Sequence, residues 1–183
     1  WDPRALSGRG HPKVTGVLPI ALSKARKLLW LMSRSSKEYV CIMQLHGPVE
    51  EARIREVCGE FVGPIYQRPP LKASVKRRLR VRRIYELEVL EVEGRYVLMR
   101  VGCEAGTYVR KLCHDIGMVL GVGAHMKELR RTRSGVFKED ETLVTLHDLK
   151  DAYDHWRETD DESWLRRAVQ PMERVVEEVP KIF

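Results

Sequence analysis

Residues 85 to 101 carry the pattern that most restricts what this chain can fold into. Apolar residues alternate with glutamates over residues 85 to 89, Glu93-Gly94-Arg95 is typical of a turn, and residues 96 to 101 are again mostly apolar. Alternation with a period of two places one face of a strand on a core and the other in water. The pattern therefore predicts an antiparallel hairpin.

The remaining elements follow from their own spacing of apolar residues. Residues 38 to 45 are apolar on both faces, which is typical of a central strand. Helical spacing predicts helices over residues 19 to 32 and 50 to 61, another opened by Gly106-Thr107, and one in the acidic tail from Thr145.

These elements alternate without a regular βαβ rhythm, and the clearest strand pair is a hairpin. We therefore predict a mixed α+β fold with a largely antiparallel sheet and flanking helices, rather than a doubly wound parallel sheet. A chain of 183 residues can bury one good core, so we expect a single domain over residues 1–183.

Positive charge is concentrated in the first three quarters of the chain. Residues 1 to 138 hold 27 basic and 13 acidic side chains, whereas residues 139 to 178 hold 5 basic and 13 acidic ones. Lys and Arg gain affinity for polyanions by releasing counterions from phosphates, so this asymmetry favours a nucleic-acid partner. Many basic proteins bind no particular polyanion, so charge alone does not decide the question.

The densest basic stretch runs from Arg68 to Arg83 and contains no acidic residue. The alternation Arg80-Val81-Arg82 predicts guanidinium groups along one face of an extended segment, where they can reach successive phosphates. The alternative is a solvated charge run without a ligand. The candidate RNA-binding residues of this stretch are Arg68, Lys76, Arg77, Arg78, Arg80 and Arg82.

A second basic cluster, from Lys127 to Lys138, adds Arg130 and Arg131 as candidate RNA contacts. The glycine-rich segment before it closes a helix instead of opening one after a strand, so it is not a dinucleotide-binding fingerprint. His114, His125 and His147 lack the spacing of metal ligands. We expect no metal and no organic cofactor.

Two further residues are candidates for chemistry. Arg110 lies near the start of its predicted helix, where we expect it to be partly buried and to have an assigned anion. That anion could be a substrate phosphate, a carboxylate that Arg110 keeps ionised, or a plain structural partner. Tyr39, at the start of the buried strand, could equally be an ordinary core residue.

Composition indicates the environment of the protein. No stretch is apolar and long enough to cross a bilayer, and the four cysteines lie in apolar runs without C-x-x-C spacing. We expect a soluble intracellular protein with reduced thiols. The absence of asparagine and the low number of glutamines, three, are typical of proteins from hot environments.

Several segments together resemble one family, the TruB and dyskerin pseudouridine synthases, and within it the catalytic subunit of archaeal and eukaryotic box H/ACA ribonucleoproteins. The likeness runs from about Pro12 to Phe183. The segments that carry it are Lys37-Glu38-Tyr39-Val40, Gln67-Arg68-Pro69-Pro70-Leu71, Ser74-Val75-Lys76-Arg77, Gly106-Thr107-Tyr108-Val109-Arg110, Gly121 to Met126, Leu129 to Gly135, Thr145 to Leu149 and Gln170 to Glu173.

The resemblance implies isomerisation of uridine to pseudouridine in ribosomal or transfer RNA, on a base flipped out of its helix, without a cofactor. Tyr39 would stack on that base, Arg110 would hold the catalytic aspartate ionised, and Tyr108 is a further candidate RNA contact. The implied partners are a guide RNA, the substrate RNA and small ribonucleoprotein subunits. The implied location is the cytoplasm of an archaeon or the nucleolus of a eukaryote.

This sequence departs from the family pattern in two respects. The family has a Lys-Pro-x-Gly segment before the catalytic loop and a PUA domain after the catalytic domain. This chain has neither, so we expect a catalytic domain shortened at both ends. The family also reads Gly-Thr-Leu-Asp-Pro before Lys-Val-Thr-Gly, whereas this chain has His11 at the aspartate position.

An imidazole at position 11 cannot replace a carboxylate, and near Arg110 its charged form would be disfavoured by like-charge repulsion. Asp2-Pro3 is the only nearby Asp-Pro pair, but Asp2 is six residues before Gly8, while His11 keeps the family's five-residue distance from Gly16. Two readings stay open: a synthase altered at residue 11, and a non-catalytic RNA-binding or assembly module of the same fold. A ribosomal-type RNA-binding protein would explain the charge but not these segments.

Overall fold

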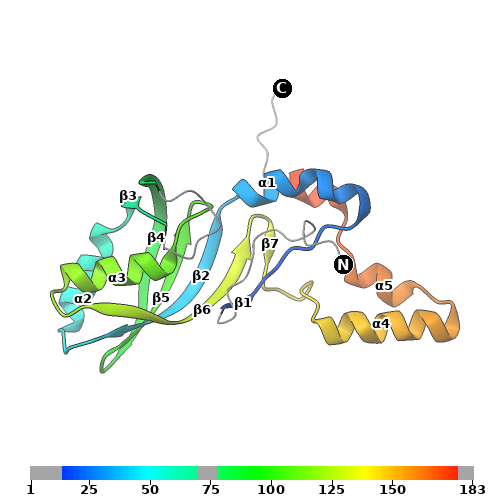
Figure 1. Ribbon diagram of the computed structural model, residues 1–183. Coiled ribbons are helices and arrows are strands. Elements are labelled where there is room, and N and C mark those ends of the chain that lie inside the picture. The colour runs from blue at the N-terminus through cyan, green and yellow to red at the C-terminus, as the bar shows by residue number, and fades with distance from the viewer. Residues whose placement is uncertain (1–13, 70–77, 177–183) are drawn as a thin grey trace.

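The computed structural model describes residues 14–69 and 78–176, and these residues form one seven-stranded sheet with helices beside it (Figure 1). The strand order is β1-β6-β2-β5-β4-β3, and β7 pairs with β6. The strands are β1 (Val14–Gly16), β2 (Lys37–Leu45), β3 (Gly63–Gln67), β4 (Arg80–Glu93), β5 (Tyr96–Cys103), β6 (Ala124–Ser134) and β7 (Phe137–Lys138). The α-helices are α1 (Leu29–Arg34), α2 (Glu51–Glu60), α3 (Val109–Val119), α4 (Leu146–Thr159) and α5 (Ser163–Ala168).

The predicted hairpin and the predicted central strand are both confirmed. β4 and β5 pair antiparallel around a turn in which Gly94 has a φ of 57°, a conformation that glycine adopts without strain. β2 lies between β5 and β6 and pairs antiparallel with both. The mixed α+β class with a largely antiparallel sheet is therefore correct, and β1 with β6 is the one parallel pair among the described strands.

β6, which occupies much of the second basic cluster, was not predicted from the sequence. Its pattern of exposure does not alternate cleanly, because the pairing of β6 with β2 shifts register between Glu38 and Tyr39 and again between Ile42 and Met43. Each shift adds a residue to one strand and interrupts the period of two. A strand with two such irregularities and four basic side chains carries little hydrophobic periodicity.

The predicted helix over residues 19 to 32 was wrong in its first part. Helical structure begins with a 3-10 helix, Ser23–Leu28, which leads directly into α1. Ser23 has a φ of 46°, in the left-handed region that no regular right-handed helix contains. Residues 19 to 22 therefore lie before the helix, although their apolar spacing fits one.

One face of the sheet is covered by α2 and α3, and the main core lies between this face and the two helices. The central buried residues come from β2, β5 and these two helices. All four cysteines are buried there with free thiols, and burial is the main cause that raises the pKa of Cys58 and of Cys103 to about 11. The thiols therefore behave as apolar packing groups.

The helix layer approaches the sheet closely at Gly117 on α3. A Cβ added there would lie 2.1 Å from the backbone nitrogen of Ala124, the first residue of β6. Because backbone atoms cannot move aside as a flexible side chain can, we expect Gly117→Ala to lower the free energy of unfolding by about 3 kcal/mol.

Urea unfolding followed by circular dichroism measures this effect. Gly59 on α2 is the matched control, because a Cβ there meets no atom within 4 Å. Gly59→Ala is expected to raise the free energy of unfolding by about 0.5–1 kcal/mol, since alanine has less backbone entropy to lose in a helix. Equal free energies for the two variants would show that α3 does not pack on β6 at this point.

The acidic tail is helical, as predicted. α4 begins with a capping box in which the Thr145 hydroxyl accepts from the Asp148 amide at 3.1 Å, and the Asp148 carboxylate accepts from the Thr145 amide at 2.7 Å. α4 contacts α5, where His155 stacks on Trp164 with ring centroids 4.2 Å apart. Figure 1 shows this helix pair well away from α2 and α3.

Candidate RNA-modification site

The structure brings several of the predicted site residues to one end of the sheet, on the face covered by α3. Tyr39 on β2, Arg131 on β6, Arg80 and Arg82 on β4 and the start of α3 all contribute to this end. His11, Lys76 and Arg77 lie outside the described residues, as does Asp2. Their predicted roles remain predictions.

Tyr39 is partly buried and packs against the core cluster that includes Val101, Cys103 and Val109. Burial is the main cause that raises the pKa of its hydroxyl, and the Cys103 thiol acts in the same direction. The charge of Arg131 and a hydrogen bond with its side chain lower that pKa and partly offset the rise. At neutral pH Tyr39 is therefore an uncharged phenol whose ring is neither fully enclosed nor free in solvent.

The segment Gly106 to Arg110, which leads into α3, is held by a buried glutamine. Gln67 is 1% exposed, its Nε2 donates to the Tyr108 carbonyl at 3.1 Å, and its Oε1 accepts from the Tyr108 amide at 2.9 Å. This pair of bonds connects the end of β3 to the residue before α3. Gln67 lies in one of the segments that resemble the family, but no sequence pattern predicted its role at the site.

Removal of the Gln67 amide leaves two backbone groups of Tyr108 without these partners in a part-buried position. We expect Gln67→Ala to lower the free energy of unfolding by about 2–4 kcal/mol and to move the start of α3. Urea unfolding measures the first effect, and amide hydrogen exchange at Tyr108 measures the second. Gln44→Ala, a partly buried glutamine on β2, is the control; a comparable loss in both variants would contradict the role assigned to Gln67.

Arg110 lies in the first turn of α3 and is exposed, so the prediction that it would be partly buried was wrong. The preceding residue, Val109, is 3% exposed and occupies the position that faces the sheet. One step along a helix turns the side chain by about 100°, which directs Arg110 away from the core. Its guanidinium is thus accessible to an anion from outside the sheet.

The predicted alternation in the first basic stretch is confirmed. Arg80 and Arg82 are partly buried, whereas Val81 between them is exposed, and Arg68 and Arg78 are exposed. Arg82 has an acidic neighbour that is remote in sequence, because its Nη1 lies 3.3 Å from Glu104 Oε1. The Arg82 guanidinium also lies beside Gly106, where an added Cβ would be 3.2 Å from Arg82 Nε.

Arg130 and Arg131 have different surroundings although they are neighbours on β6. Arg130 is exposed and forms an ion pair with Glu139, which lowers the pKa of that carboxyl group. Arg131 is partly buried, and its Nε donates to the Val17 carbonyl at 2.7 Å. Only Arg130 has the exposure expected of a simple phosphate contact.

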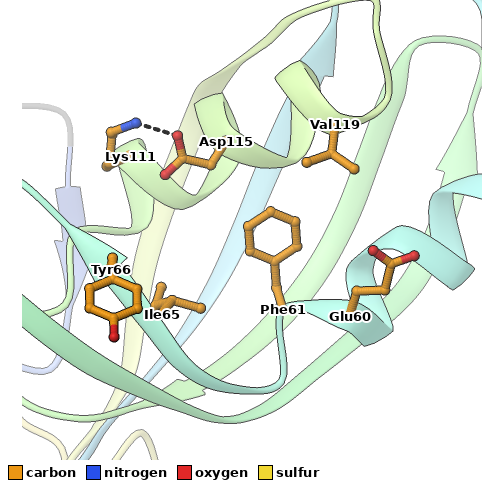
Figure 2. A pocket seen from close by; sticks show the side chains of 7 residues that line it. All are labelled: Glu60, Phe61, Ile65, Tyr66, Lys111, Asp115 and Val119. Atoms are coloured by element: carbon orange, nitrogen blue, oxygen red, sulfur yellow. Dashed lines mark hydrogen bonds and ion pairs between the residues drawn. The ribbon is translucent and has the colours of Figure 1, made fainter.

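A separate shallow pocket of about 390 Å³ lies between the end of α2, β3 and α3 (Figure 2). None of the predicted site residues lines it. Its charged residues are Glu60, Asp115 and Lys111, and Lys111 is ion-paired with Asp115. The pocket therefore has an excess of negative charge and is a poor receptor for a phosphate backbone.

Two further properties bear on the class of site. In residues 14–69 and 78–176, no group of three His, Cys, Asp or Glu side chains is placed to hold a metal ion. Within the same ranges, the helices are too short or too polar to span a membrane.

The fold and this arrangement define a pseudouridine synthase domain. The family model for the C-terminal domain of tRNA pseudouridylate synthase B matches residues 110–177, and the model for the C-terminal part of Pus10 matches residues 9–119. A crystal structure of a Cbf5-Nop10-Gar1 complex superimposes with a TM-score of 0.90 and 59% identity, covering 94% of this chain and 52% of that one. The chain belongs to the TruB/Cbf5 family of pseudouridine synthases.

Other relatives support the same family assignment. Probable tRNA pseudouridine synthase B of Pyrococcus horikoshii is 61% identical over 100% of this chain and 57% of its own length. The Methanosarcina barkeri protein of the same name is 60% identical over 97% of this chain and 52% of its own. The structure of an H/ACA RNP bound to a substrate RNA containing 2'-deoxyuridine matches with a TM-score of 0.85 and 56% identity, over 93% and 51% of the two chains. This chain thus spans a little over half the length of these relatives.

Proposed function

We propose that this chain is the catalytic domain of an RNA pseudouridine synthase that isomerises uridine within a guide-directed box H/ACA ribonucleoprotein. The observation that supports this most directly is the order of three adjacent strands. β1, which follows the segment with residue 11, pairs with β6 at Arg131, and β6 pairs at the same residue with Tyr39 on β2. The end of β1, the strand that follows the segment with residue 11, thereby lies close to the tyrosine expected to contact the base.

The reaction breaks the bond between N1 of uracil and C1' of the ribose and forms a bond between C5 and C1'. The hydrogen on C5 leaves, and N1 gains a proton, so no oxidant, reductant or cofactor is consumed. Tyr39 offers an uncharged aromatic ring on which a flipped base can stack. Arg110, exposed at the start of α3, would keep an acidic group at position 11 ionised.

This chain carries His11 where that acidic group is required, so we propose that the chain with this sequence is inactive or strongly impaired. A neutral imidazole lacks the negative charge of a carboxylate, and a protonated one is repelled by Arg110. The basic residues at the same end of the sheet, including Arg80 and the exposed Arg68 and Arg78, are retained. RNA affinity is therefore expected to survive the change at residue 11.

The proposed partners are the guide RNA, the substrate RNA and small protein subunits. The relatives whose structures match this chain were solved as Cbf5 with Nop10 and Gar1, and as an H/ACA RNP with substrate RNA. Their identity to this chain, 59% and 56%, supports equivalent surfaces here. Because the curated relatives are archaeal proteins, we propose a location in the cytoplasm of an archaeal cell.

The test is release of tritium from C5-tritiated uridine in a substrate RNA, with the His11→Asp chain assembled with a guide RNA and the small subunits. We expect release with a guide that pairs with the substrate and none with a scrambled guide. Release with both guides would contradict the guide-directed function. Absence of release with either, together with RNA binding, would instead support the non-catalytic RNA-binding module.

A further inference from the structure

A row of three residues crosses the sheet next to the proposed site. Gly16 on β1 pairs with Arg131 on β6, and Arg131 pairs with Tyr39 on β2. Side chains on directly paired positions of neighbouring strands lie on the same face, at distances that long side chains can bridge. Arg131 therefore stands between the strand that follows the catalytic loop and the tyrosine of the site.

Arg131 holds β1 by its backbone and by its side chain. The Val17 amide donates to the Arg131 carbonyl at 2.8 Å, and Arg131 Nε donates to the Val17 carbonyl at 2.7 Å. Gly16 has a φ of 105°, and an added Cβ would lie 2.1 Å from the Arg131 carbonyl oxygen. No other residue type fits at this point, so β1 is pressed directly against Arg131.

The same guanidinium reaches Tyr39. Arg131 is directly paired with Tyr39 across β6 and β2, and its positive charge lowers the pKa of the phenol and so opposes the effect of burial. A guanidinium has five N–H donors in a rigid plane, so Nε can serve the Val17 carbonyl while a terminal nitrogen serves the phenol. Arg130 has no such arrangement, because it is exposed and paired with Glu139.

We propose that Arg131 is a positioning residue, whose guanidinium fixes the phenol of Tyr39 relative to β1. This inference rests on the proposed function and replaces the sequence-based expectation that Arg131 binds RNA phosphates. A phosphate contact changes RNA affinity, whereas a positioning residue changes the rate once RNA is bound. The two roles are therefore separable by kinetics.

The experiment compares Arg131→Lys and Arg131→Gln with their parent, the His11→Asp chain assembled with guide RNA and small subunits. We expect the single-turnover rate of tritium release at saturating RNA to fall about 10–100-fold in both variants, because small misplacements of reacting groups have effects of this size. The RNA dissociation constant is expected to stay within about twofold of the parent value, since neither variant loses a phosphate contact. Arg100→Gln, on β5 and ion-paired with Glu88, is the matched control and retains the parent rate.

A raised dissociation constant with an unchanged saturating rate would overturn the inference and return Arg131 to phosphate binding. A parent that releases no tritium counts against the proposed function alone. The inference is then decided without turnover, by the fluorine resonance of Tyr39 in protein labelled with 3-fluorotyrosine and assigned with Tyr39→Phe. We expect Arg131→Lys to shift this resonance and Arg100→Gln to leave it in place; an unmoved resonance in Arg131→Lys overturns the inference.

Discussion

His11→Asp is expected to raise the rate of tritium release from C5-tritiated uridine by at least about 10³-fold over the chain with His11, because loss of a central catalytic group typically costs that much or more. The reason is electrostatic. A carboxylate at this position would be negatively charged at neutral pH, and in the proposed site Arg110 at the start of α3 would stabilise that charge. An imidazole provides either no charge or a charge of the wrong sign.

The comparison is made under single-turnover conditions with equal amounts of assembled particle. His11→Asn is the matched control, since asparagine has the shape of aspartate without its charge, and it is expected to remain at the level of the His11 chain. RNA dissociation constants should agree among all three proteins within about threefold, because the role proposed for position 11 is catalytic and not phosphate binding. Turnover by the His11 chain that disappears in Asp2→Asn would show that Asp2 supplies the carboxylate and that the account of position 11 is wrong.

The second large effect is expected from Arg110 and depends on the residue at position 11. In the His11→Asp chain, Arg110→Ala is expected to lower the rate of tritium release about 10²–10³-fold, because the carboxylate loses the cation that keeps it ionised and oriented. In free energy of unfolding, the two positions should couple by about 1–3 kcal/mol. The coupling should be absent when position 11 is His or Asn.

A double-mutant cycle measures this coupling, with urea unfolding of the four proteins that combine His11 or His11→Asp with Arg110 or Arg110→Ala. The acid limb of the rate profile gives an independent readout. In the His11→Asp chain the carboxyl pKa is expected to lie below its usual range, so activity is retained above that pKa and lost as the pH falls through it; Arg110→Ala should move the loss to higher pH. If the free energies of unfolding are additive and the acid limb of the rate profile does not move in Arg110→Ala, then Arg110 does not interact with the residue at position 11.

The negatively charged pocket beside α3 illustrates why a hollow alone does not identify a site. It is lined by Glu60, Asp115 and Lys111, and Lys111 is already paired with Asp115 (Figure 2). The proposed site instead gathers basic side chains, an uncharged tyrosine and the start of a helix. RNA recognition requires charge of the right sign and aromatic rings, which favours the second arrangement.

Local patterns in the sequence determined a large part of the fold of this protein. The alternation in residues 85 to 101 and the apolar run of β2 were sufficient for the hairpin, the central strand and the mixed α+β class, because hydrophobic periodicity is a property of the chain itself. Motif spacing was sufficient for the family, whereas the role of position 11 stays a prediction. The alternation of Arg80 and Arg82 was likewise evident from sequence.

Contacts between residues far apart in sequence were decided only by the tertiary structure. Local sequence patterns do not predict these contacts, because each depends on strand order and register. The contacts are Gln67 with Tyr108, Glu104 with Arg82, and Arg131 with Val17 and Tyr39. Neighbouring arginines on β6 therefore looked equivalent in sequence, whereas Arg130 faces solvent and Arg131 faces the site. Strand pairing sets which face a side chain occupies, and a shift of one residue reverses it, so the separate roles of these arginines depend on the assembled sheet.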